Sequence, residues 1–462
     1  MKKFSFNTLI MIFAVIVLVA AATWVVPSGE YQRQTVDGKT LVVPNSFSYT
    51  EGNPQGFADI LTSPYKGFVK AAEIIGFLFI LGGSFSILIR TGAITVSIQH
   101  LAHTLSERPH LQKFFIPAIM VIFSIGGSTF GLSEEVMLFV PIFIPLAMSL
   151  GYDSIVGLAI PFLGASAGFA GSVFNPFTVG IAQSIAQLPL YSGMEYRIII
   201  WVISTVSMIV FVTRYANKVK KNPELSVMFE VDRERRAALH LQKNTIEEFT
   251  PQHKIILIGF AFALVGLVFG VLKYQWWLNE IAALFLALGI FSGIVGKLSA
   301  THITDSFKDG AKDMVGVALI IGCARAILVI ATDGKVLDVL LYACSGVILS
   351  LHPVFAAQMM FVVQCVINFF VHSGSGQAAL TMPIMSPLAD VIGISRQTAV
   401  LAFQFGEGWI NPILPTSGFT MGVLGLANIP WDKWFRWMLP IQIYFFIIAL
   451  LLLIPPVLLH WQ

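Results

Sequence analysis

The segment Pro141-Ile142-Phe143-Ile144-Pro145-Leu146-Ala147 has a near copy 242 positions later, Pro383-Ile384-Met385-Ser386-Pro387-Leu388-Ala389. A lone match of this kind arises easily by chance in an apolar chain. Further pairs keep the same spacing: Lys66 and Lys308, Lys70 and Lys312, His110 and His352, Ser133 and Ser375, Glu135 and Gln377, Gly151 and Gly393. One register held over about 85 residues predicts an internal duplication.

The composition of this duplicated chain is that of a membrane protein. Of 462 residues, 56% are apolar and 11% are charged, whereas soluble domains carry about 25% charged residues. A soluble protein of this size has no way to hide so much apolar surface. The composition therefore excludes a soluble enzyme, a disordered chain and a nucleic-acid-binding protein, and it predicts an all-α polytopic membrane protein. Cys323, Cys344 and Cys365 lie in apolar surroundings and imply no disulfide framework.

Plain membrane spans need about 20 mostly apolar residues. They are predicted near 6–26, 67–89, 195–213, 255–272, 277–296, 313–331 and 437–459. The first is longer than the apolar part of a secretory signal, so we expect it to be retained. The polar 214–254 segment, which joins the two halves, holds nine Lys and Arg residues. By the positive-inside rule, we expect this solvated linker and Met1 to lie in the cytoplasm.

Four other segments are apolar but interrupted by Gly, Ser, Thr, Asn or Pro. Two are predicted as re-entrant hairpins, 114–150 with its tip at 126–133 and 354–392 with its tip at 373–377. Two are predicted as broken helices, 153–187 and 396–428, with the breaks ending at Asn175-Pro176 and Asn411-Pro412. Non-helical backbone persists at membrane depth only where protein or a water-filled cavity satisfies its polar groups. We therefore expect the four interruptions to meet at one midplane site.

Counting the crossings makes the 67–89 span and its copy at 313–331 point in opposite directions. Inverted-topology repeats with broken helices are typical of secondary transporters, whose sites lie between the repeats. The predicted organisation has an N-terminal span and external loop (1–66), a first repeat (67–213), the cytoplasmic linker (214–254) and a second repeat (255–462).

The paired hairpin tips, the repeated Pro-Ile-x-x-Pro-Leu-Ala and the repeated Asn-Pro break resemble the YfcC-like branch of the anaerobic C4-dicarboxylate carrier (DcuC-like) family, in the ion transporter superfamily. The resemblance covers nearly the whole chain. It implies an elevator carrier with a scaffold domain that forms a homodimer and a transport domain that moves across the bilayer. It also implies C4-dicarboxylates or amino acids, including basic ones, as substrates. In the wider superfamily, Ser-Asn-Thr-type tips hold a substrate carboxylate and sodium ions, whereas the tips here read Gly-Ser-Thr and Ser-Gly-Ser-Gly-Gln.

Polar side chains at the interruptions are the candidate substrate- and ion-binding residues. Helix starts favour a carboxylate, and ionisable groups within membrane segments are costly and usually functional. The candidates are Ser128, Thr129, Ser133, Glu134, Glu135, Asn175, Ser373, Gly374, Ser375, Gly376, Gln377, Glu407 and Asn411. Helix capping is the competing role for Asn175 and Asn411, and stabilisation of a helix dipole is the competing role for Glu134.

A coupling ion, Na⁺ or H⁺, is expected beside the substrate, with Na⁺ near Ser133, Asn175, Ser375 and Asn411. Arg325 lies in the middle of a plain span, where a scaffold salt bridge is expected and an anionic substrate is the alternative. His372 is either a proton-linked group or a wall residue. No metal-ligand spacing, Walker loop or dinucleotide fingerprint occurs in the sequence. We therefore expect no enzyme and no organic cofactor.

The charges at these positions favour one substrate class. Glu134, Glu135 and Glu407 would repel a doubly negative dicarboxylate in a low-dielectric site, unless bound sodium ions cancelled the repulsion. A basic amino acid offers a carboxylate to the helix starts and cations to the acids. The sequence predicts a secondary active transporter. The favoured substrate is a basic amino acid, moved by antiport, and the alternative is ion-coupled transport of C4-dicarboxylates. An ion channel is the alternative from another functional class. A small-molecule substrate, membrane lipid and a second copy are the expected partners.

Single-cysteine labelling tests the predicted orientation. In intact cells, an impermeant thiol reagent is expected to modify cysteines in the 27–64 segment and to spare the 214–254 linker, while His460–Gln462 are expected outside. Labelling of the linker from outside would contradict the orientation given by its Lys and Arg residues.

Overall fold

The computed structural model describes residues 8–36, 39–242, 248–274 and 276–461. In this part of the chain, eight helices are long and apolar enough to cross a membrane, so the protein is a multi-pass helical membrane protein. They are α3 (Ala72–Arg90), α5 (Pro109–Phe130), α9 (Met194–Lys221), α11 (Pro251–Tyr274), α12 (Leu278–Val295), α14 (Val315–Asp333), α16 (Pro353–Phe370) and α20 (Trp431–Leu452). An apolar helix, α1 (Thr8–Val25), precedes them, and a short helix, α21 (Ile454–Leu458), follows.

The segment between α1 and α3 contains regular structure that the sequence analysis did not predict. β1 (Gly29–Glu30) pairs with β4 (Ser48–Tyr49), and β2 (Arg33–Val36) pairs with β3 (Lys39–Val42), both antiparallel. The helix α2 (Phe57–Lys70) follows. Ala71, with φ −102° and ψ 4°, separates α2 from α3, so the second span begins at Ala72 rather than near 67.

Helix boundaries recur at the spacing of the sequence match. The pairs are α2 and α13 (Ala300–Asp313), α3 and α14, α4 (Ala93–Glu107) and α15 (Leu337–Leu349), α5 and α16, and α7 (Ser154–Ala170) and α18 (Arg396–Gly408). The packing is also reciprocal, because α2 packs against α14 while α13 packs against α3. The duplicated sequence therefore produces the same order of helices twice.

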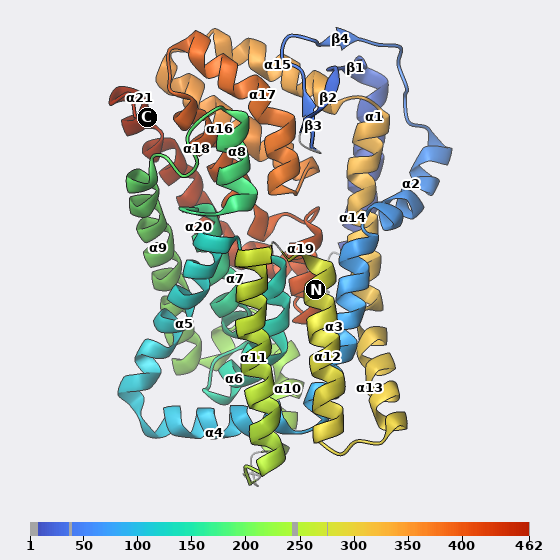
Figure 1. The fold of residues 1–462 in the computed structure, drawn as a ribbon, viewed down its shortest axis with the longest axis vertical. Coiled ribbons are helices and arrows are strands. Elements are labelled where there is room, and N and C mark those ends of the chain that lie inside the picture. The colour runs from blue at the N-terminus through green and yellow to red at the C-terminus, as the bar shows by residue number, and fades with distance from the viewer. Residues whose placement is uncertain (1–7, 37–38, 243–247, 275, 462) are drawn as a thin grey trace.

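Each predicted hairpin consists of two helical arms that pack against the same helix. In the first, α5 is joined through 131–133 to η1 (Glu134–Phe139) and α6 (Val140–Ser149), and both α5 and α6 pack against α7. In the second, α16 is joined through 371–373 to α17 (Gly374–Ile392), and both pack against α18. Figure 1 shows α4, which leads into the first hairpin, and α15, which leads into the second, at opposite ends of the molecule.

The two broken helices have the predicted interruptions. After α7 the chain is non-helical to Asn175 and then forms η2 (Pro176–Gly180) and α8 (Ile181–Ile185). After α18 it forms η4 (Asn411–Ile413) and α19 (Gly418–Leu426). Asn175 caps its half-helix, since its Oδ1 accepts a hydrogen bond of 2.9 Å from the Phe177 N–H.

The linker is more structured than the solvated segment that its charge predicts. Within 214–254, α9 continues to Lys221, η3 (Pro223–Leu225) and α10 (Phe229–Gln242) follow, and α11 begins at Pro251. Asp232 is fully buried and accepts a hydrogen bond of 2.8 Å from the Ser154 N–H at the start of α7. Arg235 donates to the Ala427 carbonyl at 2.8 Å, just after α19. The linker therefore docks against helices of both halves.

The helices form two packing groups. The scaffold group is α1, α2, α3, α11, α12, α13 and α14, and the core group is α5 to α9 and α16 to α20. Figure 1 shows α3, α12, α13 and α14 on one side of the molecule and α5 and α9 on the other. The helix α14 contacts α19 and so brings the two groups together.

Close helix packing in the core group depends on glycine, and one substitution tests it. A Cβ at Gly168 of α7 would overlap the Ser124 carbonyl of α5, whereas a Cβ at Gly266 of α11 would meet nothing within 4 Å. Gly168→Ala is expected to lower the free energy of unfolding by about 1–3 kcal/mol, because the two backbones must separate. The matched Gly266→Ala variant is expected to melt like the wild type in detergent. Equal melting temperatures for the two variants would contradict this packing.

Candidate functional site

A cavity of about 370 Å³ lies where the scaffold and core groups meet. All four interruptions contribute to its wall, as the sequence predicts for a midplane site. Its polar and charged lining residues are Lys70, Glu73, Ser133, Glu134, Thr178, Arg325, His372, Ser373, Ser375, Glu407, Asn411 and Ser417. Among the residues that the structure describes, no group of three or more His, Cys, Asp or Glu side chains is placed to hold a metal ion.

The second hairpin supplies hydroxyl groups to the cavity. Ser373 caps α17, since its Oγ accepts a hydrogen bond of 3.2 Å from the Gly376 N–H, and it lies 3.3 Å from the Ser375 Oγ. Ser375 therefore lies in the first helical turn rather than in a loop. The neighbouring His372 Nε2 lies 2.6 Å from the Thr416 Oγ1. The positive end of the helix dipole at the start of α17 favours an anion nearby.

Glycine allows the start of α17 to approach the other interruptions. A Cβ at Gly374 would overlap the Thr178 methyl group and lie 3.5 Å from the Glu407 Oε1. At the first hairpin, Gly131 has φ +72°, and a Cβ there would lie 2.8 Å from the Asn175 Oδ1. The tips and breaks therefore meet at distances that a larger residue would not permit.

Glu407 is the carboxylate most enclosed by the core group. Its side chain is 1% exposed, and its Oε1 accepts a hydrogen bond of 2.9 Å from the Asn411 Nδ2. Its Oε2 is buried and has no hydrogen-bond partner in the described chain. Asn368 supports the break by donating to the Gly406 and Glu407 carbonyls at 3.2 and 3.1 Å. Glu407 therefore lines the cavity, while its buried Oε2 has no donor in the described chain.

The adjacent acids Glu134 and Glu135 separate in space. Glu134 lines the cavity. Glu135 is 6% exposed, and its Oε2 instead accepts a hydrogen bond of 3.0 Å from the Ser133 N–H. Glu135 therefore stabilises the turn at the hairpin tip and does not line the cavity.

Five other candidates also lie outside the cavity lining. Ser128 accepts hydrogen bonds from the Val173 and Phe174 N–H groups, and Thr129 donates to the Ile125 carbonyl at 2.7 Å. Gln377 is fully buried and donates to the Gln364 carbonyl and Oε1 at 2.9 and 2.8 Å. The remaining two are Asn175, the cap described above, and Gly376. Ser128 and Gln377 therefore connect parts of the core group, whereas the Thr129 hydrogen bond stays within its own helix.

The scaffold group supplies cavity residues that the sequence analysis did not select. Lys70, Glu73 and Trp277 lie on the cavity wall. Arg325 also lines the cavity, and the expected scaffold salt bridge is not observed in the described ranges. Lys70 matches Lys312 in the repeat. A Lys near the end of a predicted span is common, so the sequence alone does not indicate that Lys70 faces a cavity.

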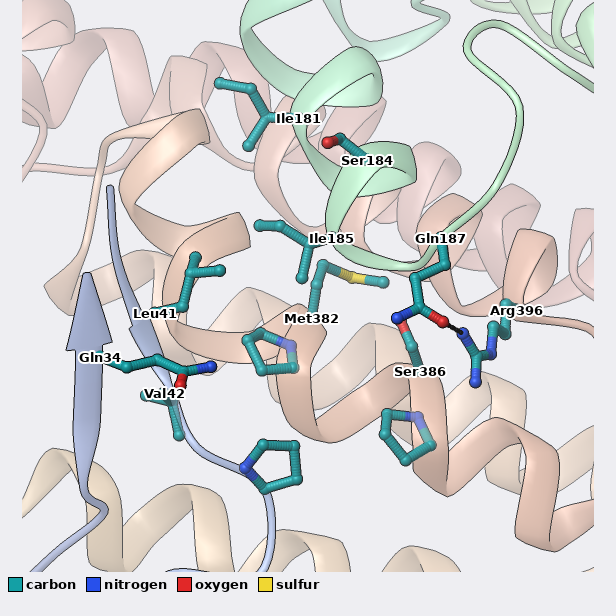
Figure 2. Close-up of a pocket in the computed structure, with 13 residues that line it drawn as sticks. Gln34, Leu41, Val42, Ile181, Ser184, Ile185, Gln187, Met382, Ser386 and Arg396 are labelled. Carbon is teal, nitrogen blue, oxygen red and sulfur yellow. Dashed lines mark hydrogen bonds between the residues drawn. The ribbon is translucent and has the colours of Figure 1, made fainter. Parts of the chain in front are cut away.

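A second cavity of about 420 Å³ lies between β2, β3, α8 and α17. Figure 2 shows apolar side chains on its wall, including Leu41, Ile185 and Met382, beside neutral polar ones such as Gln34 and Ser184. Its cation, Arg396, pairs with Asp390 at 2.7 Å and also contacts Gln187. Although it is larger, this cavity is lined by no carboxylate and by none of the residues at the hairpin tips or helix breaks. The smaller, charged cavity is therefore the candidate site.

Comparison with known proteins identifies the family. Residues 6–457 match the family described as C4-dicarboxylate anaerobic carrier (DcuC). The chain is 37% identical to the protein named "Putative basic amino acid antiporter YfcC" of Escherichia coli, with 93% of this chain and 92% of that protein covered. It is 31% identical to an uncharacterized protein of Haemophilus influenzae, with 100% of this chain and 98% of that protein covered. The chain belongs to the C4-dicarboxylate anaerobic carrier family and is a membrane transporter, not an enzyme.

Two solved transporter structures also align with the chain. The YdaH transporter of Alcanivorax borkumensis aligns over 96% of this chain and 97% of its own, with 16% identity and a TM-score of 0.41. MtrF of Neisseria gonorrhoeae aligns over 99% of this chain and 96% of its own, with 18% identity and a TM-score of 0.43.

Ser375 and Gln377 lie two residues apart, and their variants are expected to behave differently. Ser375→Ala removes a hydroxyl from the cavity and is expected to weaken transport while the melting temperature stays unchanged. Gln377→Ala leaves the buried Gln364 groups without their donor and is expected to lower the free energy of unfolding by about 1–3 kcal/mol. Transport assays and thermal melting of both variants make the comparison. A stable Gln377→Ala variant with defective transport would contradict the structural role.

Proposed function

We propose that this member of the family is a secondary active transporter that exchanges basic amino acids across the bacterial inner membrane. The observation that carries the proposal is the charged cavity between the two packing groups, which contains the carboxylates Glu73, Glu134 and Glu407. The name of the Escherichia coli relative, which includes basic amino acid antiporter, supports the same substrate class.

A basic amino acid matches the polar groups of the cavity one by one. Its α-carboxylate is placed at the start of α17, where Ser373 and Ser375 supply hydroxyls and the helix dipole favours an anion. Its α-ammonium is proposed to lie at the Glu407 carboxylate, which lines the cavity. Its side-chain cation is placed at Glu134. Charge-assisted hydrogen bonds of this kind are stronger than neutral ones.

The proposed movement is of the elevator type, between inverted repeats. Supporting it are the reciprocal packing of α2 with α14 and of α3 with α13, and the two hairpins that follow helices at opposite ends of the molecule. The core group holds both hairpins and both broken helices, so it is the part proposed to carry the substrate. The scaffold group is the part proposed to stay in place, as in transporters built from inverted repeats.

The proposed orientation places β1–β4 outside and the linker helix α10 in the cytoplasm. Figure 1 shows the strands and α21 at one end of the molecule and α10 near the other, consistent with the linker's many Lys and Arg residues. The exposed Phe262 and Val265 on α11 are proposed to contact lipid or the second copy of a homodimer.

Ion-coupled transport of a C4-dicarboxylate is the second candidate. Lys70 and Arg325 provide two cations for two carboxylates, and the family description names this substrate class. A void of about 20 Å³ beside the cavity is lined by Ser133, Ser166 and Asn411 among others, and such a volume holds one water or ion. A sodium ion there would offset part of the acidic charge. Two of the residues expected around Na⁺, Asn175 and Ser375, do not line this void.

Uptake into proteoliposomes distinguishes the substrates. Labelled arginine or ornithine is expected to enter when the vesicles contain unlabelled basic amino acid, and succinate or fumarate is expected neither to enter nor to compete. Glu407→Gln and Glu134→Gln are each expected to lower kcat/KM for arginine by about tenfold or more, because each removes a charged hydrogen bond worth about 1.5–3 kcal/mol.

The matched control is Glu51→Gln, which changes an exposed carboxylate outside the cavity and is expected to transport like the wild type. Strong dicarboxylate uptake without competition by basic amino acids would favour the second candidate. Uptake that does not saturate and is not stimulated by counter-substrate would indicate a channel.

A further inference from the structure

Arg325 is an ionised side chain without a direct partner. It lies in the middle of α14, is partly exposed, and lines the cavity. It has neither a hydrogen bond nor a salt bridge within the described residues. A free guanidinium inside a membrane protein is costly unless water or an opposite charge stabilises it. Its stabilisation must therefore come from groups that share the cavity.

The charged and titratable groups around Arg325 lie on both sides of the cavity. From the scaffold group it is faced by Lys70 and Glu73, and from the core group by Glu134, His372 and Glu407. Arg325 interacts electrostatically with Glu134 and with His372. Glu134 also interacts with Glu407, as a like charge. Glu134 is therefore the carboxylate whose charge Arg325 balances across the boundary between the groups.

We propose that Arg325 is a resident counter-cation that holds the substrate-free core group in place through its attraction to Glu134. This inference rests on the proposed function and adds the reason why transport would be an exchange. The two residues belong to different packing groups, because Arg325 is on α14 and Glu134 is at the tip of the first hairpin. Movement of the core group past the scaffold separates them.

The cost of that separation depends on what occupies the cavity. When the cavity is empty, separation leaves Glu134 without its counter-charge in a region of low dielectric, where the attraction is strong. When a basic amino acid is bound, its side-chain cation replaces Arg325 at Glu134, and the core group carries a balanced pair. The loaded core group then moves and the empty one does not. A carrier that returns only when loaded is an antiporter.

Accessibility of a single cysteine tests the inference without any substrate. The reporter is Ser375→Cys, in a background where Cys323, Cys344 and Cys365 are alanine. In sealed vesicles without amino acids, an impermeant thiol reagent is expected to label the reporter from one side only. In Arg325→Gln and in Glu134→Gln, labelling is expected from both sides, because either change removes the attraction.

Arg325→Lys retains the positive charge and is expected to keep one-sided labelling. The matched control is Arg90→Gln, which removes an exposed positive charge at the end of α3 and is also expected to keep one-sided labelling. Thermal melting confirms that each variant is folded. One-sided labelling in both folded variants, Arg325→Gln and Glu134→Gln, would overturn the inference.

Transport provides the second measurement. The ratio of arginine uptake with and without internal counter-substrate is expected to be about tenfold or more in the wild type and close to one in Arg325→Gln. An unchanged ratio in a folded Arg325→Gln variant would overturn the inference. If the wild type exchanges no basic amino acid, the proposed function fails, whereas the labelling comparison still tests the counter-cation by itself.

Discussion

The cost of an ionised side chain inside a bilayer is the constraint on which the rest of the structure depends. Glu134, Glu407 and Arg325 lie on helices that enter or cross the apolar region, and each needs water, an opposite charge or a hydrogen-bond donor. The interruptions of the hairpins and broken helices supply these at one place, around a cavity of about 370 Å³. In return, the cavity gives their free backbone groups a polar environment. The ionised side chains are therefore stabilised by the helix interruptions, and the interruptions are stabilised by the polar cavity that these side chains line.

Much of this arrangement could be predicted from the sequence because interruptions have a local cause. Gly, Ser and Asn-Pro in otherwise apolar segments end helices wherever they occur, so both hairpins and both breaks lie where the residues place them. Seven of the thirteen candidates line the cavity, and all seven lie at or beside a hairpin tip or a helix break. They are Ser133, Glu134, Ser373, Gly374, Ser375, Glu407 and Asn411. The repeated spacing also predicted which helices correspond.

What could not be predicted depends on helix rotation and on contacts between distant segments. Ser375 and Gln377 differ by two positions, which turns them by about 200° around a helix axis. Residue polarity alone does not show which of the two faces the cavity. Asp232 belongs to a strongly charged linker, yet it is buried at the start of α7. Lys70 and Trp277 reach the cavity only because the scaffold packs against the core. Such contacts follow from tertiary packing, which leaves no local pattern in the sequence.

The polar wall of the cavity is divided unequally between the two groups. Within the core group, the hydrogen bonds from Val173 and Phe174 to Ser128, and from Asn368 to the Gly406 and Glu407 carbonyls, connect both breaks to neighbouring helices. Together with the glycine contacts, they make this wall one packed unit, and packed units move as rigid bodies rather than deform. Arg325 and Lys70 belong to the scaffold group. In the proposed mechanism, a ligand that changes the charge of the core wall changes the attraction between the two groups, and this couples binding to movement through electrostatics at their boundary.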